Sequence, residues 1–194
     1  MYNYISGRLD EATPAYAVID CHGVGYLLEI TLNTYSAIKD LQQVKLLVHE
    51  VVREDAHLLF GFNTSAERDM FRLLLNVNGV GAATARMMLS SLTVEELTQA
   101  IVDQDVKRVQ KVKGIGAKTA QRILLELRDK VDPFAIQTLE GSKVTNSNAT
   151  EALSALVMLG FPRAASEKVV EKVASANPTA SVEEIIKLSL AHGI

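Results

Sequence analysis

Two short glycine-rich segments of this chain have the composition of an anion-binding turn. Residues 78–85 read NGVGAATA and residues 113–120 read KGIGAKTA. At an offset of 35 residues both glycines, the alanine after them, the threonine and the final alanine coincide, and Val80 aligns with Ile115. Glycine accepts a positive φ and lets an anion approach the backbone, and the free N–H groups of a following helix attract phosphate. The repeat therefore predicts a module that grips a phosphodiester backbone at two points.

The predicted contacts with this backbone are the two turns and the polar side chains that follow the second turn. They are Asn78, Gly79, Val80, Gly81, Lys113, Gly114, Ile115, Gly116, Lys118, Thr119 and Arg122. Lys118 and Arg122 are one helical turn apart and so share a helix face. Contacts of this kind read the sugar-phosphate chain and not the base edges, so they predict little sequence specificity.

Positive charge is concentrated around the second turn. The whole sequence has a formal net charge of −3, yet between residues 107 and 130 eight lysines and arginines face only two acidic residues, a local charge of +6. Such a run can equally be a solvated helix face. Its coincidence with a glycine turn favours the binding of a polyanion.

Other chemistries find no support in the sequence. A P-loop requires glycine immediately before its lysine, where Ala117 stands, and a dinucleotide-binding fingerprint requires a third glycine, where Thr84 stands. A single Gly-x-Gly turn would more simply be a sharp connection between helices, but a repeat in fixed register makes that alternative less favourable. The four histidines lack metal-ligand spacing, and Cys21 is more simply structural than nucleophilic. The sequence therefore indicates a non-enzymatic binding protein without a metal or cofactor.

A second charged feature is the adjacent pair Glu54 and Asp55. The pair stands between two β-rich runs, residues 49–52 and 57–60, and so should form the tip of a β-hairpin. Three earlier strand-like runs precede it, with a helical turn near residues 35–40. These runs are Tyr16–Ile19, Tyr26–Ile30 and Val44–Val48. About five strands within residues 1–63 suit a small closed barrel of the OB type.

From Thr64 onward the apolar residues recur with a helical period. Thr64 with Glu67, and Thr93 with Glu96, predict capping boxes at the start of two helices. The predicted order up to residue 137 is helix, glycine turn, helix, connecting helix, and then the same unit again. Each glycine turn would thus be held between two helices, with Val80 and Ile115 buried inside.

The last part of the chain is predicted to be a small tethered domain. Residues 138–149 are small and polar without periodicity, which predicts a flexible linker. Residues 150–194 predict three helices, with Leu156, Leu159 and Phe161 in their core. A domain of this size is near the lower limit for independent folding and, tethered in this way, is expected to bind a partner.

The chain carries no sign of membrane insertion or export. No apolar run approaches the roughly 20 residues of a membrane span, and the first residues lack the pattern of a signal peptide. Cys21 is the single cysteine, so no internal disulfide can form. A protein of the reducing cytoplasm is expected.

The two turns resemble the helix-hairpin-helix motif, and the order of parts resembles the RuvA family, the Holliday-junction-binding subunits of the bacterial branch-migration machine. Three further segments carry this resemblance: VVREDA at 51–56, LFGF at 59–62 and LGF at 159–161. The resemblance spans the whole chain and implies an α+β multidomain protein. Its parts would be an OB-type barrel (1–63), a tandem helix-hairpin-helix domain (64–137), the linker (138–149) and a three-helix, UBA-like domain (150–194).

The resemblance also implies a function. The protein would form a homotetramer that holds a four-way DNA junction open and nearly planar, with Glu54 and Asp55 as an acidic pin at the junction centre. Its third domain would recruit the RuvB ATPase, where the ATPase activity of the complex would reside, and the RuvC resolvase would join on the same junction. Whether one or two tetramers (an octamer) bind a junction is left open.

Two departures from the family pattern concern the hairpins. Ala82 and Ala83 stand where members often carry a basic residue in the first hairpin, and Lys113 and Ala117 stand where many have proline and lysine around the second. The first hairpin is therefore expected to bind phosphate through backbone groups alone and to be the weaker half.

Two other functions also stay open. A repair glycosylase or lyase would use a catalytic lysine or aspartate, and Asp129 and Asp132 follow the second hairpin. A protein adaptor would use the hairpins only as structure.

Overall fold

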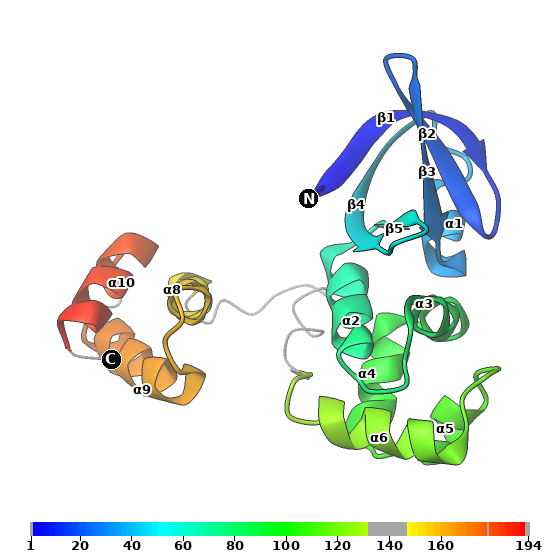
Figure 1. The fold of residues 1–194 in the computed structure, drawn as a ribbon. Coiled ribbons are helices and arrows are strands. Elements are labelled where there is room, and N and C mark those ends of the chain that lie inside the picture. Colours follow the sequence, from blue (N-terminus) through cyan, green and yellow to red (C-terminus); the bar gives the residue numbers. More distant parts are fainter. Residues whose placement is uncertain (1, 132–146, 178, 193–194) are drawn as a thin grey trace. The chain divides into compact units, whose positions relative to one another are not determined.

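The computed structural model describes residues 2–131, 147–177 and 179–192. The chain divides into two compact units, Met1–Gln137 and Thr138–Ile194 (Figure 1). Within the described ranges, no helix has both the length and the apolar character needed to cross a lipid bilayer.

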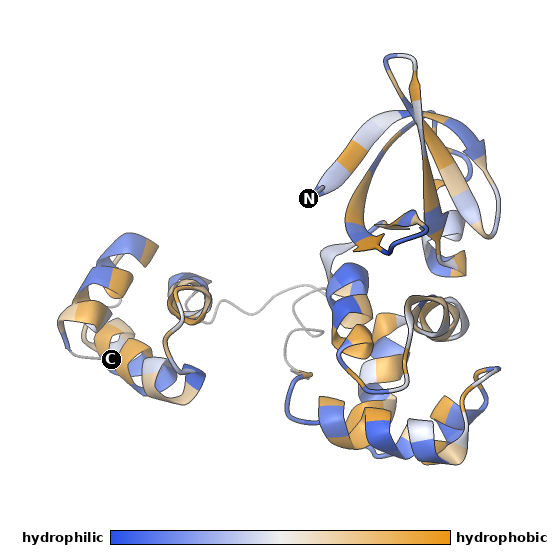
Figure 2. Ribbon diagram, in the orientation of Figure 1, coloured by the Kyte–Doolittle hydropathy of each residue, from blue (hydrophilic) through white to orange (hydrophobic). Residues whose placement is uncertain are grey.

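The first unit begins with a closed five-stranded barrel. Its strands are β1 (Tyr4–Ala12), β2 (Tyr16–Cys21), β3 (Val24–Ile30), β4 (Gln43–Val52) and β5 (His57–Phe62), with α1 (Leu32–Ile38) between β3 and β4. They close in the order β1-β2-β3-β5-β4, and only the β3–β5 pair is parallel. Apolar and polar residues alternate along the strands, as Figure 2 shows, so one face of each strand fills the barrel. The predicted OB-type barrel is confirmed.

The strands predicted from the sequence differ from the observed ones in two places. β1 was missed, and the runs assigned at 44–48 and 49–52 form one strand, β4. β1 is hard to recognise because glycine at its centre weakens the strand pattern. A Cβ added at Gly7 would lie 2.3 Å from the Asp20 carbonyl oxygen, so the close approach of β1 to β2 requires glycine there.

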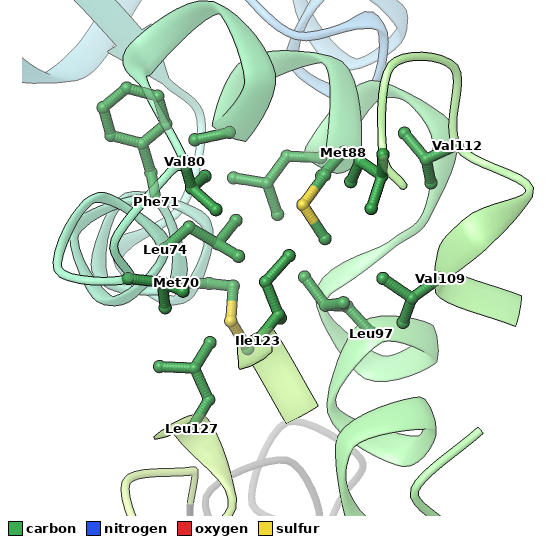
Figure 3. Packing of buried hydrophobic residues seen from close by; sticks show 14 of the residues in the cluster. Met70, Phe71, Leu74, Val80, Met88, Leu97, Val109, Val112, Ile123 and Leu127 are labelled. Atoms are coloured by element: carbon green, nitrogen blue, oxygen red, sulfur yellow. The ribbon is translucent and has the colours of Figure 1, made fainter. Parts of the chain in front are cut away.

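Five helices follow the barrel within the described part of the first unit and confirm the predicted order of two hairpins around a connecting helix. They are α2 (Ser65–Leu75), α3 (Ala82–Ser91), α4 (Val94–Val102), α5 (Val106–Gln110) and α6 (Ala117–Leu127). Their apolar faces share one core, to which the barrel contributes Phe60 and Phe62. Figure 3 shows Met70, Leu97 and Ile123 converging in this core from three different helices. The barrel and both hairpins are therefore parts of one packed body.

One of the two predicted capping boxes is present in full. At α4, the Thr93 side chain accepts a hydrogen bond from the Glu96 N–H, and the Glu96 carboxylate accepts one from the Thr93 N–H. At α2 only half of the box forms: Thr64 Oγ1 accepts from the Glu67 N–H at 3.2 Å. The Glu67 carboxylate does not accept a hydrogen bond from the Thr64 N–H. It is buried instead and accepts hydrogen bonds from Thr31 and Thr34.

The second unit is the predicted three-helix domain, with α8 (Ser147–Met158), α9 (Arg163–Ala176) and α10 (Val182–Ala191). Leu156 is fully buried and Phe161 packs against the core, as expected. The prediction for Leu159 was wrong, because this side chain is 65% exposed. α8 ends at Met158, and the positive φ of Gly160 turns the chain so that Leu159 lies outside the core.

The linker expected at 138–149 lies mostly outside the described residues. Its last three positions are helical, because α8 begins at Ser147.

Candidate nucleic-acid interface

The two glycine turns have the same backbone geometry. Gly79 and Gly114 both have a φ of +90°. The N–H of Val80 donates to Val77 O at 3.0 Å, and that of Ile115 donates to Val112 O at 3.2 Å. Val80 and Ile115 are buried, at 6% and 7% exposure. The repeat seen in the sequence is thus a repeat of structure, with the apolar residue anchoring each turn in the core.

The second glycine of each turn is not required by the fold. Gly81 and Gly116 have φ values of −90° and −80°, which any residue adopts. A Cβ added at either position would meet no atom within 4 Å. Because neither backbone strain nor internal packing calls for glycine here, the missing side chain leaves open space on the outside of the turn. This is the arrangement needed when an external group approaches the backbone.

The helices that follow these turns also lack a side-chain cap. Gly81 and Gly116 are the N-cap residues of α3 and α6 and make no capping hydrogen bond. In contrast, a threonine, serine or aspartate side chain caps α1, α2, α4, α5 and α10. α9, which follows Pro162, is also without such a cap. The first N–H groups of α3 and α6 therefore remain available at the positive end of the helix dipole, which favours an anion.

The second turn carries most of the positive charge. Lys113 and Lys118 are exposed, and neither side chain forms a hydrogen bond or ion pair with any residue that the structure describes. Arg122 is half-exposed and is engaged within the protein. Its Nη1 donates to the Asn78 carbonyl oxygen at 3.2 Å, and its Nε lies 3.8 Å from Glu126 Oε1. Arg122 therefore links α6 to the first turn, besides adding charge near the second.

The first turn is electrically neutral. Ala83 is exposed, and Met87 occupies the position that corresponds to Arg122 at the 35-residue offset. Arg86 is the one cation on α3, and it is directed to the barrel: Nη1 donates to Ala15 O at 2.7 Å and Nε lies 3.4 Å from Glu29 Oε2. The cation that contacts the first turn is therefore Arg122, which comes from α6, and the first turn and α3 supply no free cation of their own among the described residues.

Glu54 and Asp55 lie at the tip of the hairpin formed by β4 and β5, where they are exposed. The turn is closed by a hydrogen bond from the Arg53 N–H to Ala56 O at 2.8 Å, and Val52 pairs with His57. The predicted hairpin is confirmed. Two adjacent carboxylates at an exposed tip will repel a phosphate that approaches it.

Glu67 is a buried acidic residue of this unit whose burial was not predicted from the sequence. Glu67 was assigned only to a capping box, although it lies on the apolar stripe of α2 with Met70, Phe71 and Leu74. That spacing of i, i+3, i+4 and i+7 marks the buried face of a helix. An acidic residue on this face was the signal that its side chain would be buried.

Comparisons with known proteins cover the three parts of the chain. The family model described as RuvA N terminal domain matches residues 1–61, and SAM-like Helix-hairpin-helix tandem matches residues 71–129. The model described as RuvA, C-terminal domain matches residues 147–192.

Similar proteins match over nearly the whole length. A protein of Christiangramia forsetii is 48% identical over 194 residues, one of Parabacteroides distasonis is 49% identical over 193, and one of Bacteroides thetaiotaomicron is 44% identical over 198. In each pair 98% of both chains is covered, and each relative is named Holliday junction branch migration complex subunit RuvA. From its barrel to its last helix, this chain belongs to the RuvA family.

Proposed function

We propose that this protein binds four-way DNA junctions by their structure and acts as the non-catalytic, DNA-binding subunit of a branch-migration complex in recombination and repair. The observation that carries the proposal is the pair of equivalent glycine turns, each open on its outer side and each followed by a helix without a side-chain cap. Two anion sites on one packed body suit a DNA arm, whose charge is regularly spaced along its backbone.

The DNA backbone would be held by the N–H groups of both turns and by cations near the second. The turns supply Asn78–Gly81 and Lys113–Gly116, and α6 supplies Lys118, Thr119 and Arg122. Since these groups contact phosphates, affinity should depend little on sequence and should fall steeply as salt rises.

The acidic tip would supply the preference for a junction. In a homotetramer with fourfold symmetry, four copies of Glu54 and Asp55 would meet near the axis, where the strands of a junction exchange. Their charges would repel the continuous backbone of an ordinary duplex and would direct separated strands into different arms, with the junction held open and nearly planar. The domain limits of this proposal are 1–63 and 64–137 as expected from the sequence, then a linker that ends before α8, and a last domain that begins with α8 at Ser147.

The second unit would recruit the RuvB ATPase, which supplies the motor activity, and RuvC would act on the same junction in the cytoplasm. Apolar side chains at the end of α8 support a docking role. Val157, Met158 and Leu159 are 39%, 89% and 65% exposed. A compact unit that leaves three consecutive apolar side chains in water presents a surface typical of a protein interface.

A repair enzyme and an adaptor are less well supported. Asp129 is exposed on the first unit, without the enclosed setting of a catalytic acid, and Asp132 lies outside the described residues. An adaptor would not need glycine at positions 81 and 116, where the fold accepts other residues.

A competition gel-shift between a four-way junction and a linear duplex of equal length tests the proposal. The wild type should prefer the junction, and Glu54→Gln/Asp55→Asn should lose much of this preference because it binds duplex more tightly. Glu151→Gln/Glu171→Gln removes the same charge from exposed sites of the second unit and should leave the preference unchanged. Equal binding of both DNAs by the wild type would refute a junction-specific function.

A further inference from the structure

Glu67 forms a buried polar joint between α2 and the barrel. The residue is 5% exposed, and its two carboxylate oxygens accept hydrogen bonds from two threonines at the start of α1, the helix between β3 and β4. Thr34 Oγ1 donates to Oε2 at 2.7 Å, and Thr31 Oγ1 donates to Oε1. Both hydroxyls are also acceptors: Thr31 Oγ1 caps α1 through the Thr34 N–H at 3.0 Å, and Thr34 Oγ1 receives the Asn63 N–H at 3.1 Å.

Two further contacts hold the same helix to the barrel. Arg68 Nη1 donates to the backbone and side-chain oxygens of Asn3, at 3.1 and 2.8 Å. Phe71 packs against Phe60 and Phe62, with ring centroids 5.1 and 4.9 Å apart. α2 is thus held by a buried carboxylate, a guanidinium and an aromatic cluster.

The joint lies between the two features that would distinguish a junction from a duplex. β5 runs from the acidic tip to Phe62, and α2 begins three residues later and leads to the first glycine turn (Figure 1). The stem of the acidic hairpin also packs on the helical core through Val51 and Leu58. Any rotation of α2 relative to the barrel would therefore change the position of the glycine turns relative to the acidic tip.

A carboxylate is a costly way to hold this joint. Burial raises the pKa of Glu67, and the hydrogen bonds from Thr31 and Thr34 offset part of this shift. An apolar residue on the same stripe would pack without the desolvation penalty. Apolar contacts such as those of Val51 and Leu58 are not directional, whereas hydrogen bonds fix an orientation. Glu67 therefore contributes a fixed orientation of α2.

We propose that Glu67, held by Thr31 and Thr34, is a positioning residue for junction recognition: without touching DNA, it fixes the acidic hairpin relative to the two glycine turns and thereby sets the preference for a four-way junction over a duplex. The inference rests on the proposed function, because it concerns how the two parts of that site act together.

Thr34→Val and Thr34→Ser form a matched pair that tests the role. Valine removes the hydroxyl at nearly constant volume, and serine keeps it. For Thr34→Val the ratio of junction to duplex affinity should fall about tenfold, which corresponds to about 1.4 kcal/mol. Duplex affinity should rise, as for Glu54→Gln/Asp55→Asn, because a displaced acidic tip repels the duplex less, while the two intact turns keep junction affinity nearly unchanged. Thr34→Ser should recover most of the ratio, and Glu67→Gln should behave like Thr34→Val.

Two controls separate positioning from a loss of stability. Ile19→Val shortens a fully buried side chain of the barrel and should lower the melting temperature without changing the ratio. In a double-mutant cycle, Thr34→Val should have no further effect on the ratio in the Glu54→Gln/Asp55→Asn background, because both changes act through the acidic tip.

A ratio that stays unchanged in Thr34→Val and Glu67→Gln would overturn the inference and leave the proposed function standing. Additive effects in the cycle would overturn it as well. Absence of any junction preference in the wild type would overturn the proposed function and the inference together.

Discussion

At the scale of the residue, each glycine turn contains two glycines with different reasons to be there. Gly79 and Gly114 have a positive φ, which other residues adopt only under strain. Gly81 and Gly116 have ordinary dihedral angles and open surroundings, so the fold does not need them. The first glycine of each pair is required by the turn, and the second is explained, in the proposed function, by the group that binds there. Substitution can separate these roles.

Gly116→Ala should therefore reduce DNA binding and leave the protein folded. The added methyl group would stand where a phosphate would approach the turn, so junction affinity should fall about tenfold, while an alanine at a compatible φ changes stability by less than about 1 kcal/mol. Gly114→Ala should instead destabilise the protein by about 1–2 kcal/mol, because its φ is positive. Thermal melting and junction titrations of both variants check this. Unchanged affinity in a folded Gly116→Ala protein would contradict the role of the open turn.

At the scale of the element, the sequence predicted what is local. The barrel class, the two hairpins, the cap of α4 and the acidic tip follow from spacing and propensity within short windows. β1 escaped prediction because Gly7 is explained by a contact with Asp20, which lies on another strand. Glu67 escaped for the same reason: the partners of its carboxylate, Thr31 and Thr34, are more than 30 residues away. Leu159 was misplaced because its exposure depends on the exact residue at which α8 ends.

The buried carboxylate of α2 should make stability depend on pH. Burial raises the pKa of Glu67 in the folded protein above its ordinary value of 4.5. The folded state therefore holds the proton more tightly than the unfolded state, and the stabilising contribution of protonated Glu67 is lost as pH rises through the raised pKa. Relative to Glu67→Gln, the wild type should be more stable near pH 4 than near pH 7.

Urea unfolding of both proteins at several pH values measures this difference. Asp69→Asn removes an exposed acid from the same helix and serves as the matched control. If the wild type instead became more stable relative to Glu67→Gln as the pH rose from 4 to 7, the burial effect would be contradicted.

At the scale of the whole molecule, the two units divide the work. The first unit joins the barrel and both hairpins through a continuous core, so its two glycine turns and its acidic tip belong to one body. The second unit has its own core and exposes apolar side chains at the end of α8. DNA binding and partner binding should therefore respond independently to substitution.

Leu159→Ser should weaken the binding of RuvB at least tenfold and leave junction affinity unchanged, because the side chain is exposed and contributes little to the core. Co-sedimentation of the two proteins, with and without junction DNA, measures both effects. Leu125→Ser makes the same change at an exposed position of α6 in the first unit and should not affect RuvB binding. Equal loss in both variants would show that the end of α8 is not the docking surface.

The bond from Arg122 to the Asn78 carbonyl gives the tandem repeat a property that neither copy has alone. It braces α6, the helix that follows the second turn, against the first turn, so the distance between the two turns is built into the protein. If both turns bind phosphates as proposed, the protein would select DNA by the distance between its phosphates and not by its base sequence. A double helix keeps its phosphates at set separations and could contact both turns at little entropic cost. A flexible single strand would first have to be ordered to reach both.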